Sequence, residues 1–356
     1  MYFLGMNNRY NSFRIDGVMN NDVYGLAVNG SNGGQAGTQP VSMESIEQIQ
    51  VNIAPFDIRQ SGFTGGSINA ITKSGTNEFH GSVYGFGNNE SLIGSKYRLM
   101  NGKRSEKYPD QYEYQAGLTL GGPIIKNKLF FFANYEKADK TYQNPYAIGN
   151  AASRIDATEA ASVLKRLQEM AAEQGLAYTG SLEATDVYTK SDKANVKLDW
   201  NINDRHKASF RWGLVSARQA NSVSSAVYLN ATDFIYDFVS KTNSFVAELQ
   251  SQLSEGWDNE LRVSYVRVRD QREPGAPFPM IQVSNVGDGT LQLGNDRSSM
   301  ANSLDQDVWS ITDNVTWNAG RHTVTFGTHN ELYKFSNLFI PVSYTHLRAH
   351  ETLSDL

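Results

Sequence analysis

Residues 193–200 read Lys-Ala-Asn-Val-Lys-Leu-Asp-Trp, and residues 207–214 read Lys-Ala-Ser-Phe-Arg-Trp-Gly-Leu. In both stretches an apolar residue stands at every second position, and residues 201–205 between them are rich in Asn and Asp. Successive side chains of a β-strand point to opposite faces, so this alternation predicts two strands, each with one face suited to lipid and one suited to water. Because Asn and Asp favour tight turns, the whole stretch predicts a β-hairpin.

The same pattern recurs along the chain. Strands are expected near residues 77–88, 111–120, 128–137, 192–200, 206–215, 241–253, 258–269, 306–317 and 322–334. Their connections alternate in length, with short turns at 121–127, 201–205, 254–257 and 318–321 and long connections at 89–110, 138–191, 216–240 and 270–305. Short turns at one end and long loops at the other are the layout of an outer-membrane β-barrel. This regularity favours a barrel over a soluble antiparallel sandwich, which the alternation by itself would also allow.

Aromatic residues stand beside the short turns. Trp200, Trp257 and Trp317 are expected to form part of a girdle at the membrane interface. Two irregularities interrupt the alternation: the apolar phase changes between residues 261–265 and 266–268, and Asp313 lies on the apolar face of its strand. Either a β-bulge or an exit from the membrane would explain each of them.

The composition excludes several classes of protein. The chain has 356 residues and a mean hydropathy of −0.46, and no stretch approaches the roughly 18 to 20 apolar residues of a transmembrane helix. Cysteine is absent, which excludes disulfide frameworks and cysteine-ligated metals. A net charge of −5 with interspersed signs argues against nucleic acid as a partner. Residues 1–10 show no secretory signal, and we expect the chain to be a fragment that begins inside a domain.

One segment within the connection 138–191 predicts a helix. Asp156 and Glu159 have the spacing of a capping box, and Gly175 is placed to end the helix. The apolar stripe between them consists of Val163, Leu164, Leu167, Met170 and Ala171. We expect a small external lid element here. Residues 1–76 are richer in Asn and Gly around short strands at 9–16 and 45–53, which predicts a compact α/β module before the barrel.

An ordered series of motifs runs through the first part of the chain. Residues 14–17 read Arg-Ile-Asp-Gly, residues 46–51 read Ile-Glu-Gln-Ile-Gln-Val, and residues 65–75 read Gly-Gly-Ser-Ile-Asn-Ala-Ile-Thr-Lys-Ser-Gly. Residues 79–86 read Phe-His-Gly-Ser-Val-Tyr-Gly-Phe, and residues 120–132 read Leu-Gly-Gly-Pro-Ile-Ile-Lys-Asn-Lys-Leu-Phe-Phe-Phe. Gly65 and Gly66 are expected to take positive φ and to let the backbone approach a barrel wall closely.

This series resembles the end of the plug domain and the start of the barrel in TonB-dependent outer-membrane receptors, and residues 120–132 resemble their Oar-like (carboxypeptidase-regulatory-like) branch. The resemblance implies an all-β membrane protein. Residues 77–342 would form an incomplete antiparallel transmembrane β-barrel of about nine strands, preceded at 1–76 by the C-terminal part of a small α/β plug domain. The plug-to-barrel junction would consist of Gly65, Gly66, Ile68, Asn69, Ile71, Thr72 and Lys73.

The resemblance also implies a function. A large solute such as a peptide, glycan or metal chelate would cross the outer membrane of a Gram-negative bacterium, by uptake or, in the Oar-like branch, by export. Energy would come from the TonB complex through an N-terminal segment absent here, and the barrel would contact outer-membrane lipid. Nine strands do not close an even-stranded barrel, so further strands are expected. Residues 343–356 resemble translated sequencing adapter and are expected to be a non-native tail.

Residues for catalysis or for a cofactor are not expected in this chain. His346 and His350 have a spacing that suits a metal, but they stand in the tail and no third ligand accompanies them. Residues 285–296 have a calcium-loop composition without the spacing of an EF-hand, which favours a plain loop. We therefore expect no metal site, no cofactor and no enzymatic activity.

A ligand surface is expected where the long connections meet the plug segment 18–37. The candidate aromatic platforms are Tyr108, Tyr142, Tyr146, Tyr178, Tyr228 and Tyr236. Tyrosine offers an apolar face and a polar tip, although packing within a girdle or loop is the alternative role for each. Two other classes of protein stay open: a surface-exposed β-rich adhesin that binds a partner without transport, and a β-sandwich hydrolase.

Overall fold

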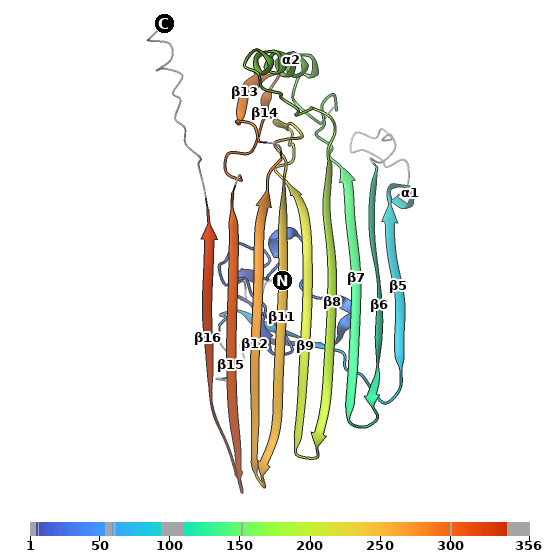
Figure 1. The fold of residues 1–356 in the computed structure, drawn as a ribbon, viewed down its shortest axis with the longest axis vertical. Helices are drawn as coiled ribbons and strands as arrows, with labels where there is room; N and C mark the ends of the chain where they lie inside the picture. The colour runs from blue at the N-terminus through green and yellow to red at the C-terminus, as the bar shows by residue number, and fades with distance from the viewer. Residues whose placement is uncertain are drawn as a thin grey trace.

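The computed structural model describes residues 5, 7–53, 59, 62–93, 110–150, 152–275, 277–299 and 301–339. Their dominant feature is a nine-stranded antiparallel sheet, which we call the wall (Figure 1). Its strands, in spatial order, are β16 (His322–Leu338), β15 (Ser303–Ala319), β12 (Trp257–Glu273), β11 (Tyr236–Ser254), β9 (His206–Asn221), β8 (Asp186–Asn203), β7 (Leu129–Gln143), β6 (Gln111–Ile125) and β5 (His80–Asn89). A four-residue helix, α1 (Glu90–Ile93), follows β5.

Each predicted strand corresponds to one wall strand, and several are longer than expected at the long-loop end. β11 begins at Tyr236 rather than at residue 241, and β8 begins at Asp186 rather than at 192. The backbone ladder thus continues beyond the residues in which apolar and polar side chains alternate. The predicted extent of the first short turn was wrong. Residues 121–125 belong to β6, and only residues 126–128 form the turn.

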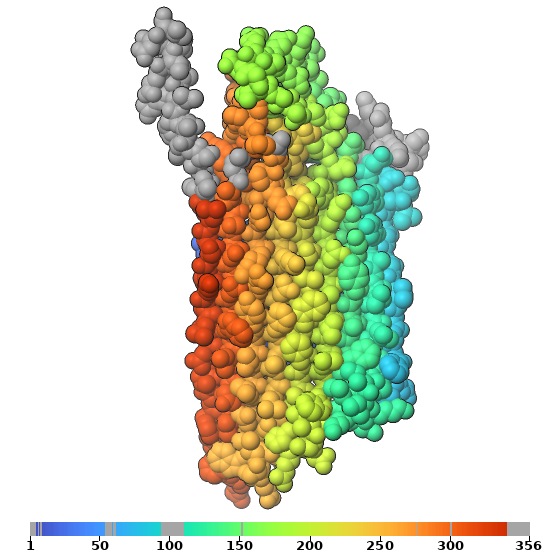
Figure 2. Space-filling view, viewed as in Figure 1, coloured from blue at the N-terminus to red at the C-terminus, as the bar shows by residue number. Residues whose placement is uncertain are grey.

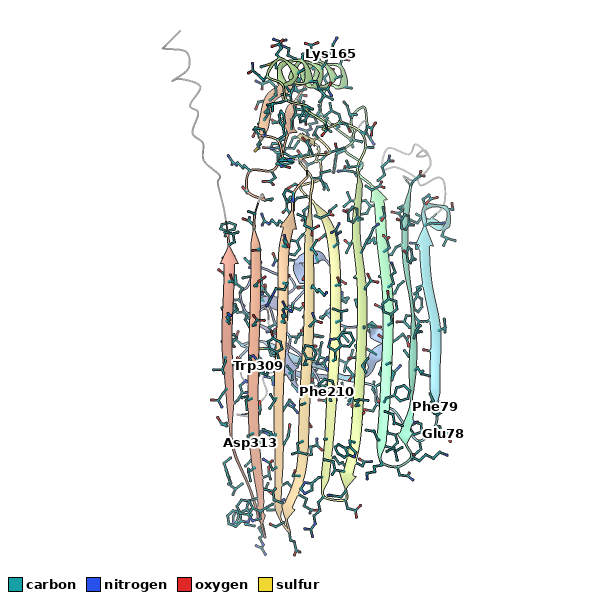
Figure 3. The ribbon with its side chains drawn as sticks, viewed as in Figure 1. Glu78, Phe79, Lys165, Phe210, Trp309 and Asp313 are labelled. Carbon is teal, nitrogen blue, oxygen red and sulfur yellow. The ribbon has the colours of Figure 1, made fainter. Side chains whose placement is uncertain are left out.

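The outer face of the wall carries a continuous apolar row. One rung across eight strands consists of Leu332, Trp309, Tyr265, Phe245, Trp212, Val196, Ala133 and Leu120. Trp309 and Phe210 are labelled on this face in Figure 3. At the short-turn end, Trp257 and Trp317 stack with ring centroids 5.4 Å apart, as a girdle requires. Figure 2 shows the same face as a surface of packed side chains.

The phase change in β12 has an explanation on both faces of the wall. β12 pairs with β15 without a register shift over residues 257–271, so no bulge is present there. On the inner face, Val266 and Val268 pack against Val18. On the outer face, Arg269 binds Asp307 with an Nη2 to Oδ1 distance of 2.9 Å, which marks an exit from the apolar band. Asp313 also faces outward.

The N-terminal residues 7–76, which we call the plug module, form a mixed sheet on the inner face of the wall (Figure 1). Its strand order is β2 (Val18–Met19), β1 (Ser12–Ile15), β4 (Gly66–Thr72) and β3 (Ile46–Ile53), with β1 parallel to β4. Helical turns in its described residues are the short 3₁₀ segments η1 (Asn8–Tyr10), η2 (Gly34–Ala36) and η3 (Met43–Ser45).

Three of the long connections fold together into a unit that we call the cap, at the end of the wall opposite the short turns (Figure 1). It contains α2 (Ala157–Glu173) and a sheet of β10 (Tyr228–Asn230), β14 (Gly289–Leu293) and β13 (Ile281–Val286). Its buried core consists of Ile155, Ala160, Ala171, Tyr178, Leu182, Leu229, Ala231, Val286, Leu291 and Leu293. The sequence predicted a lid element in one loop, and the structure shows that three loops build it. Across the described residues, no helix has the length and apolarity needed to cross a membrane.

The predicted helix is confirmed, with one difference at its start. The Asp156 carboxylate accepts hydrogen bonds from the backbone N–H groups of Thr158 and Glu159, each at 2.9 Å. The Glu159 carboxylate does not complete a capping box. It accepts a hydrogen bond from the Gly287 N–H at 2.7 Å and so joins α2 to the β13–β14 turn. Gly175 adopts a left-handed conformation with φ of 72° just after the helix.

Candidate functional site

A buried carboxylate on the inner face of the wall holds the plug module. Glu136 of β7 is 1% exposed and accepts four hydrogen bonds from four different segments. The donors are Ser42 Oγ at 2.6 Å, Gln115 Nε2 at 2.7 Å, Lys193 Nζ at 2.8 Å and the Tyr84 hydroxyl at 3.0 Å. Ser42 is the plug residue, and the other three donors belong to wall strands. Because the charge is paired and hydrogen-bonded, the carboxylate is stable without water.

The wall strands around Glu136 leave room for this contact. Gly117 of β6 stands opposite Glu136 in the ladder, and the Tyr84 ring occupies the space that a side chain there would fill. A Cβ added at Gly117 would lie 2.4 Å from the Tyr84 hydroxyl oxygen. The glycine therefore lets Tyr84 reach across β6 to the carboxylate on β7.

A second buried charge pair joins the plug module to the wall. Asp16, in the turn between β1 and β2, places its Oδ2 2.9 Å from Nε of Arg211, which is 4% exposed. The same carboxylate accepts hydrogen bonds from the N–H and hydroxyl of Thr72, both at 2.8 Å. Lys197 of β8 donates to the Thr72 carbonyl at 3.2 Å. Two motifs that are 56 residues apart in the sequence thus meet at one wall arginine.

A third charged group faces the same turn. Arg262 of β12 binds Glu248 at 2.9 Å and Glu260 at 2.6 Å. Its guanidinium packs over Gly17, where an added Cβ would lie 2.6 Å from Nη1. Burial and the nearby Arg262 lower the pKa of Arg14 in the plug module. Glu248 and Glu260 of the wall therefore compensate the neighbouring positive charges of Arg14 and Arg262 at this contact.

The junction motif forms part of the plug sheet and not, as its glycines suggested, the close passage to the wall. Residues 66–72 form β4, the strand that pairs with both β1 and β3 at the centre of the plug sheet. Gly65 and Gly66 do not adopt positive φ, and the left-handed glycine of this region is Gly62, with φ of 82°. The expectation of positive φ at Gly65 and Gly66 was wrong. Gly66 is the first residue of β4, a central strand that needs extended backbone, and Gly65 directly precedes it. Asn69 accepts a hydrogen bond from the Gly17 N–H at 2.9 Å, and Lys73 pairs with Glu44 at 3.8 Å.

The remaining motif positions lie within the plug sheet. Ile68 stands opposite Phe13 and Val51, and Ile71 stands opposite Gln48.

The close approach between the plug module and the wall occurs at Gly75 instead. A Cβ added there would lie 2.2 Å from the Phe131 carbonyl oxygen and 2.8 Å from that of Gly122. On the opposite face, the Phe79 ring covers Gly122, whose added Cβ would lie 2.4 Å from Cδ1 of Phe79. Residues 73–79 therefore pass the β6–β7 hairpin in direct backbone contact. Figure 3 labels Phe79 at the short-turn end of the wall.

A polar cavity of about 420 Å³ separates the plug module from the wall beside these contacts. Asp16, Asn69, Lys197, Arg211 and Glu248 contribute to its lining. A cavity of this size and polarity can hold several water molecules. Water at this position can hydrate the charged groups that line the cavity, while Val18 of the plug module packs against Val246, Val266 and Val268 of the wall.

The far end of the plug module is also attached to the wall. Gln35 donates a hydrogen bond to Asp270 at 3.3 Å, and Ala36 packs with Ala217 and Phe238. The Tyr24 ring lies 5.9 Å from that of Phe335 on β16. The predicted apex 18–37 thus contacts β9, β11, β12 and β16.

The candidate tyrosines fall into different environments. Tyr178 is 7% exposed in the cap core, where its ring contacts Phe278 and its hydroxyl donates to Asp233 at 2.9 Å. Tyr236 packs against the Arg272 guanidinium 5.4 Å from its ring centroid. Tyr142 and Tyr228 are exposed, Tyr146 is half-buried, and Tyr108 lies outside the described residues. A packing role thus accounts for Tyr178 and Tyr236, while Tyr142 and Tyr228 are open to solvent.

Among the described residues, no three His, Asp or Glu side chains are placed to hold an ion together. The calcium-like segment 285–296 contains the β13–β14 turn, and Asp296 accepts hydrogen bonds from Ser222 and Ser298. His346 and His350 lie outside the described residues.

The cap should be more stable at acid pH. Burial raises the pKa of Asp233, opposed by the hydrogen bond from Tyr178. Because the folded state binds this proton more tightly than the unfolded chain, the stabilisation is present below the unfolded pKa of about 3.9 and is lost as pH rises through the folded pKa. We expect hydrogen-exchange protection factors in α2 to fall as the pH rises above about 4 and through the folded pKa of Asp233. Asp233→Asn removes the titrating group, and an unchanged pH dependence in that variant would contradict the assignment.

The fold and its interface define a class of protein. A strand wall with an apolar outer face, a tryptophan girdle and a polar inner face filled by a separate module is a plugged membrane β-barrel.

Comparisons with known proteins place the chain in a family. The sequence profile described as "Outer membrane beta barrel domain" matches residues 71–149 and 138–342, and the chain belongs to this family. The TonB-dependent transporter Oar of Myxococcus xanthus is 28% identical over 208 residues, covering 53% of this chain and 19% of the relative. A probable TonB-dependent siderophore receptor, PirA of Acinetobacter baumannii, is 30% identical over 168 residues, covering 45% of this chain and 20% of the relative.

Solved structures show the same fold. The outer membrane transporter YddB of Escherichia coli superposes with a TM-score of 0.60 at 12% identity, covering 94% of this chain and 41% of that one. The siderophore receptor PirA of Acinetobacter baumannii gives 0.58 at 16% identity, covering 92% and 41%. The expected resemblance to TonB-dependent receptors of the Oar-like branch is confirmed, and the location is the outer membrane of a Gram-negative bacterium. The chain spans about two fifths of these solved structures and a fifth of the curated relatives.

Proposed function

We propose that this chain contributes to a TonB-dependent receptor that moves a large solute across the outer membrane with energy delivered through TonB. In this proposal, residues 1–76 are the C-terminal part of the plug, residues 77–342 are the N-terminal part of the barrel, and residues 343–356 are a non-native tail. The wall contacts outer-membrane lipid, and neither catalysis nor nucleic-acid binding is part of the function. The relatives named above are transporters and receptors.

One observation carries the proposal. Buried polar groups centred on Glu136 and Arg211 hold the plug module, and the apolar contacts beside them, at Val18 and Ala36, are small. An apolar interface would lose its hydrophobic stabilisation on opening, whereas charged groups regain hydration when they separate. An interface of this kind, beside a polar cavity, suits a plug that is displaced and then returns.

The solute class is proposed from the relatives and the cap. PirA of Acinetobacter baumannii, which is similar in both sequence and structure, is named a siderophore receptor, and this supports a metal chelate among the large solutes. Of the expected tyrosines, Tyr142 and Tyr228 are exposed at the external end, and we propose them as contacts for such a solute. An adhesin without transport is the alternative, and the named relatives do not favour it.

The test follows plug displacement and needs no knowledge of the solute. Ser42 is 2% exposed and none of these 356 residues is cysteine. In the intact receptor, with any other cysteine replaced, Ser42→Cys gives a single thiol that a maleimide reaches only when the plug moves. We expect labelling in cells with TonB to be at least tenfold faster than in cells without it. Ser162→Cys, on the exposed side of α2, should label equally in both. Slow labelling of Ser42→Cys at the same rate in both strains would favour the adhesin.

A further inference from the structure

The outer face of the wall carries a cluster of cations at the margin of its apolar band. Lys241 of β11 stands directly opposite Arg269 of β12 in the ladder. Two residues nearer the short turns, Arg267 stands opposite Asp307, whose other neighbour is Lys334 of β16. The flanking Thr242, Val266 and Val268 are buried on the inner face, so the four cations point outward. We call Lys241, Arg267, Arg269 and Lys334 the basic patch.

Of the four cations, Arg269 alone makes a hydrogen bond or ion pair to a carboxylate within the described part of the chain. Arg269 binds both oxygens of Asp307, at 2.9 and 3.0 Å, and lies 3.4 Å from Asp305. The Tyr265 hydroxyl also donates to Asp307 at 2.7 Å. With Asp307 occupied in this way, Lys241 and Arg267 remain exposed, and within the described residues neither has a hydrogen bond or ion pair. The basic patch therefore keeps a surplus of positive charge.

An aromatic surface lies next to the basic patch on the side of the apolar band. The rings of Phe245 and Tyr265 are 6.2 Å apart with an interplanar angle of 14°, and those of Tyr265 and Trp309 are 4.6 Å apart at 24°. Tyr265 and Trp309 stand two positions along their strands from Arg267 and Asp307 respectively, about 7 Å away. A flat apolar surface directly below unpaired cations fits a ligand with an anionic head and hydrocarbon chains.

The position of the basic patch identifies the leaflet. Its residues lie in the parts of β11, β12 and β16 next to the long connections, whereas the stacked Trp257 and Trp317 stand beside the short turns. In an outer-membrane barrel the long loops are external, so the basic patch faces the headgroups of the outer leaflet. That leaflet consists largely of lipopolysaccharide, whose lipid A carries phosphates above its acyl chains.

We propose that the basic patch binds a lipid A phosphate of lipopolysaccharide, with an acyl chain lying over Phe245, Tyr265 and Trp309. Lys241 and Arg267 supply the unpaired positive charge, and Arg269 is held in place by Asp307. Phosphate accepts hydrogen bonds from both kinds of cation. The site is separate from the plug contacts, and it would fix the depth and orientation of the wall in the membrane.

The test uses the protein purified from outer membranes in detergent and stripped of endogenous lipid. Binding of diphosphoryl lipid A is measured for the parent and for Lys241→Gln/Arg267→Gln. We expect roughly 30-fold weaker binding in the double variant, because each cation near a lipid headgroup contributes on the order of 1 kcal/mol. Lys165→Gln/Arg166→Gln removes the same charge, one lysine and one arginine, from the exposed face of α2, where Figure 3 labels Lys165. This control should bind as the parent does.

Three results would overturn the assignment. Equal affinity of the parent and the double variant would show that the basic patch does not bind lipid A. Equal competition by phosphatidylglycerol would show a general anionic-lipid surface. A change of oligomer size in the double variant without lipid would show that a second copy covers this face. The assay needs neither TonB nor solute, so its outcome is independent of the proposed transport.

Discussion

Lys193→Met is expected to lower the free energy of unfolding by about 3 to 5 kcal/mol and to loosen the plug module. Lys193 Nζ lies 2.8 Å from Glu136 Oε1, and the two side chains are 9% and 1% exposed. Methionine fills a similar volume but leaves the Glu136 carboxylate buried without a counter-charge. The cost is therefore the desolvation of an unpaired charge, which exceeds that of the lost hydrogen bond.

The measurement is the urea dependence of unfolding, followed by tryptophan fluorescence, together with the labelling rate of Ser42→Cys. The variant should show a lower midpoint and faster labelling without TonB, because Ser42 donates to the same carboxylate. Glu136→Gln/Lys193→Met removes both charges and should recover most of the loss. If Lys193→Met unfolds at the parent midpoint, the Glu136 carboxylate is not a buried charge in the membrane.

Gly75→Ala is the second change with a large expected effect. The added Cβ would lie 2.2 Å from the Phe131 carbonyl oxygen and 2.9 Å from the Phe131 nitrogen, both backbone atoms of β7. Backbone in a paired hairpin cannot yield as a flexible side chain can, so the cost should reach or exceed the upper end of the 1 to 3 kcal/mol typical of overpacking. We expect most of the protein to fail to reach the compact, heat-modifiable form in the outer membrane.

Gly85→Ala in β5 is a matched control for Gly75→Ala. Gly85 of β5 faces outward, and a Cβ added there meets no atom within 4 Å. Gly85→Ala should therefore fold as well as the parent, since alanine also restricts the unfolded chain. Folded yields are compared by gel mobility with and without boiling. If Gly75→Ala folds as well as Gly85→Ala, residues 73–79 do not pass the β6–β7 hairpin as described.

The wall was predictable because its signal is local. The alternation in residues 193–200 and 207–214 arises from side chains that point alternately to lipid and to the interior, and any strand between these two media repeats it. The start and end of α2 were predictable for a similar reason, because Asp156 and Gly175 act within a few residues of themselves. The strand ends beyond the membrane were not, since the ladder continues there without an apolar face.

The contacts of the plug module carried no such local signal. Ser42 and Glu136 are 94 residues apart, and nothing near either residue marks it as a partner of the other. The glycines of the junction were a similar case. Gly65 and Gly66 looked suited to a close passage, yet Gly75 makes it, because β4 runs through the centre of the plug sheet and the chain reaches the wall only after that strand ends.

The sequence by itself determined that this chain forms membrane-crossing strands joined by alternately short and long connections, and the motif series predicted its family. Tertiary structure alone decided that three loops share one cap core, that Tyr178 is buried in it, and that Glu136 and Arg211 hold the plug module. The physical reason is the range of the forces. Periodicity and capping act between neighbours in the chain. Desolvation and charge pairing depend on which distant segments the tertiary structure brings together.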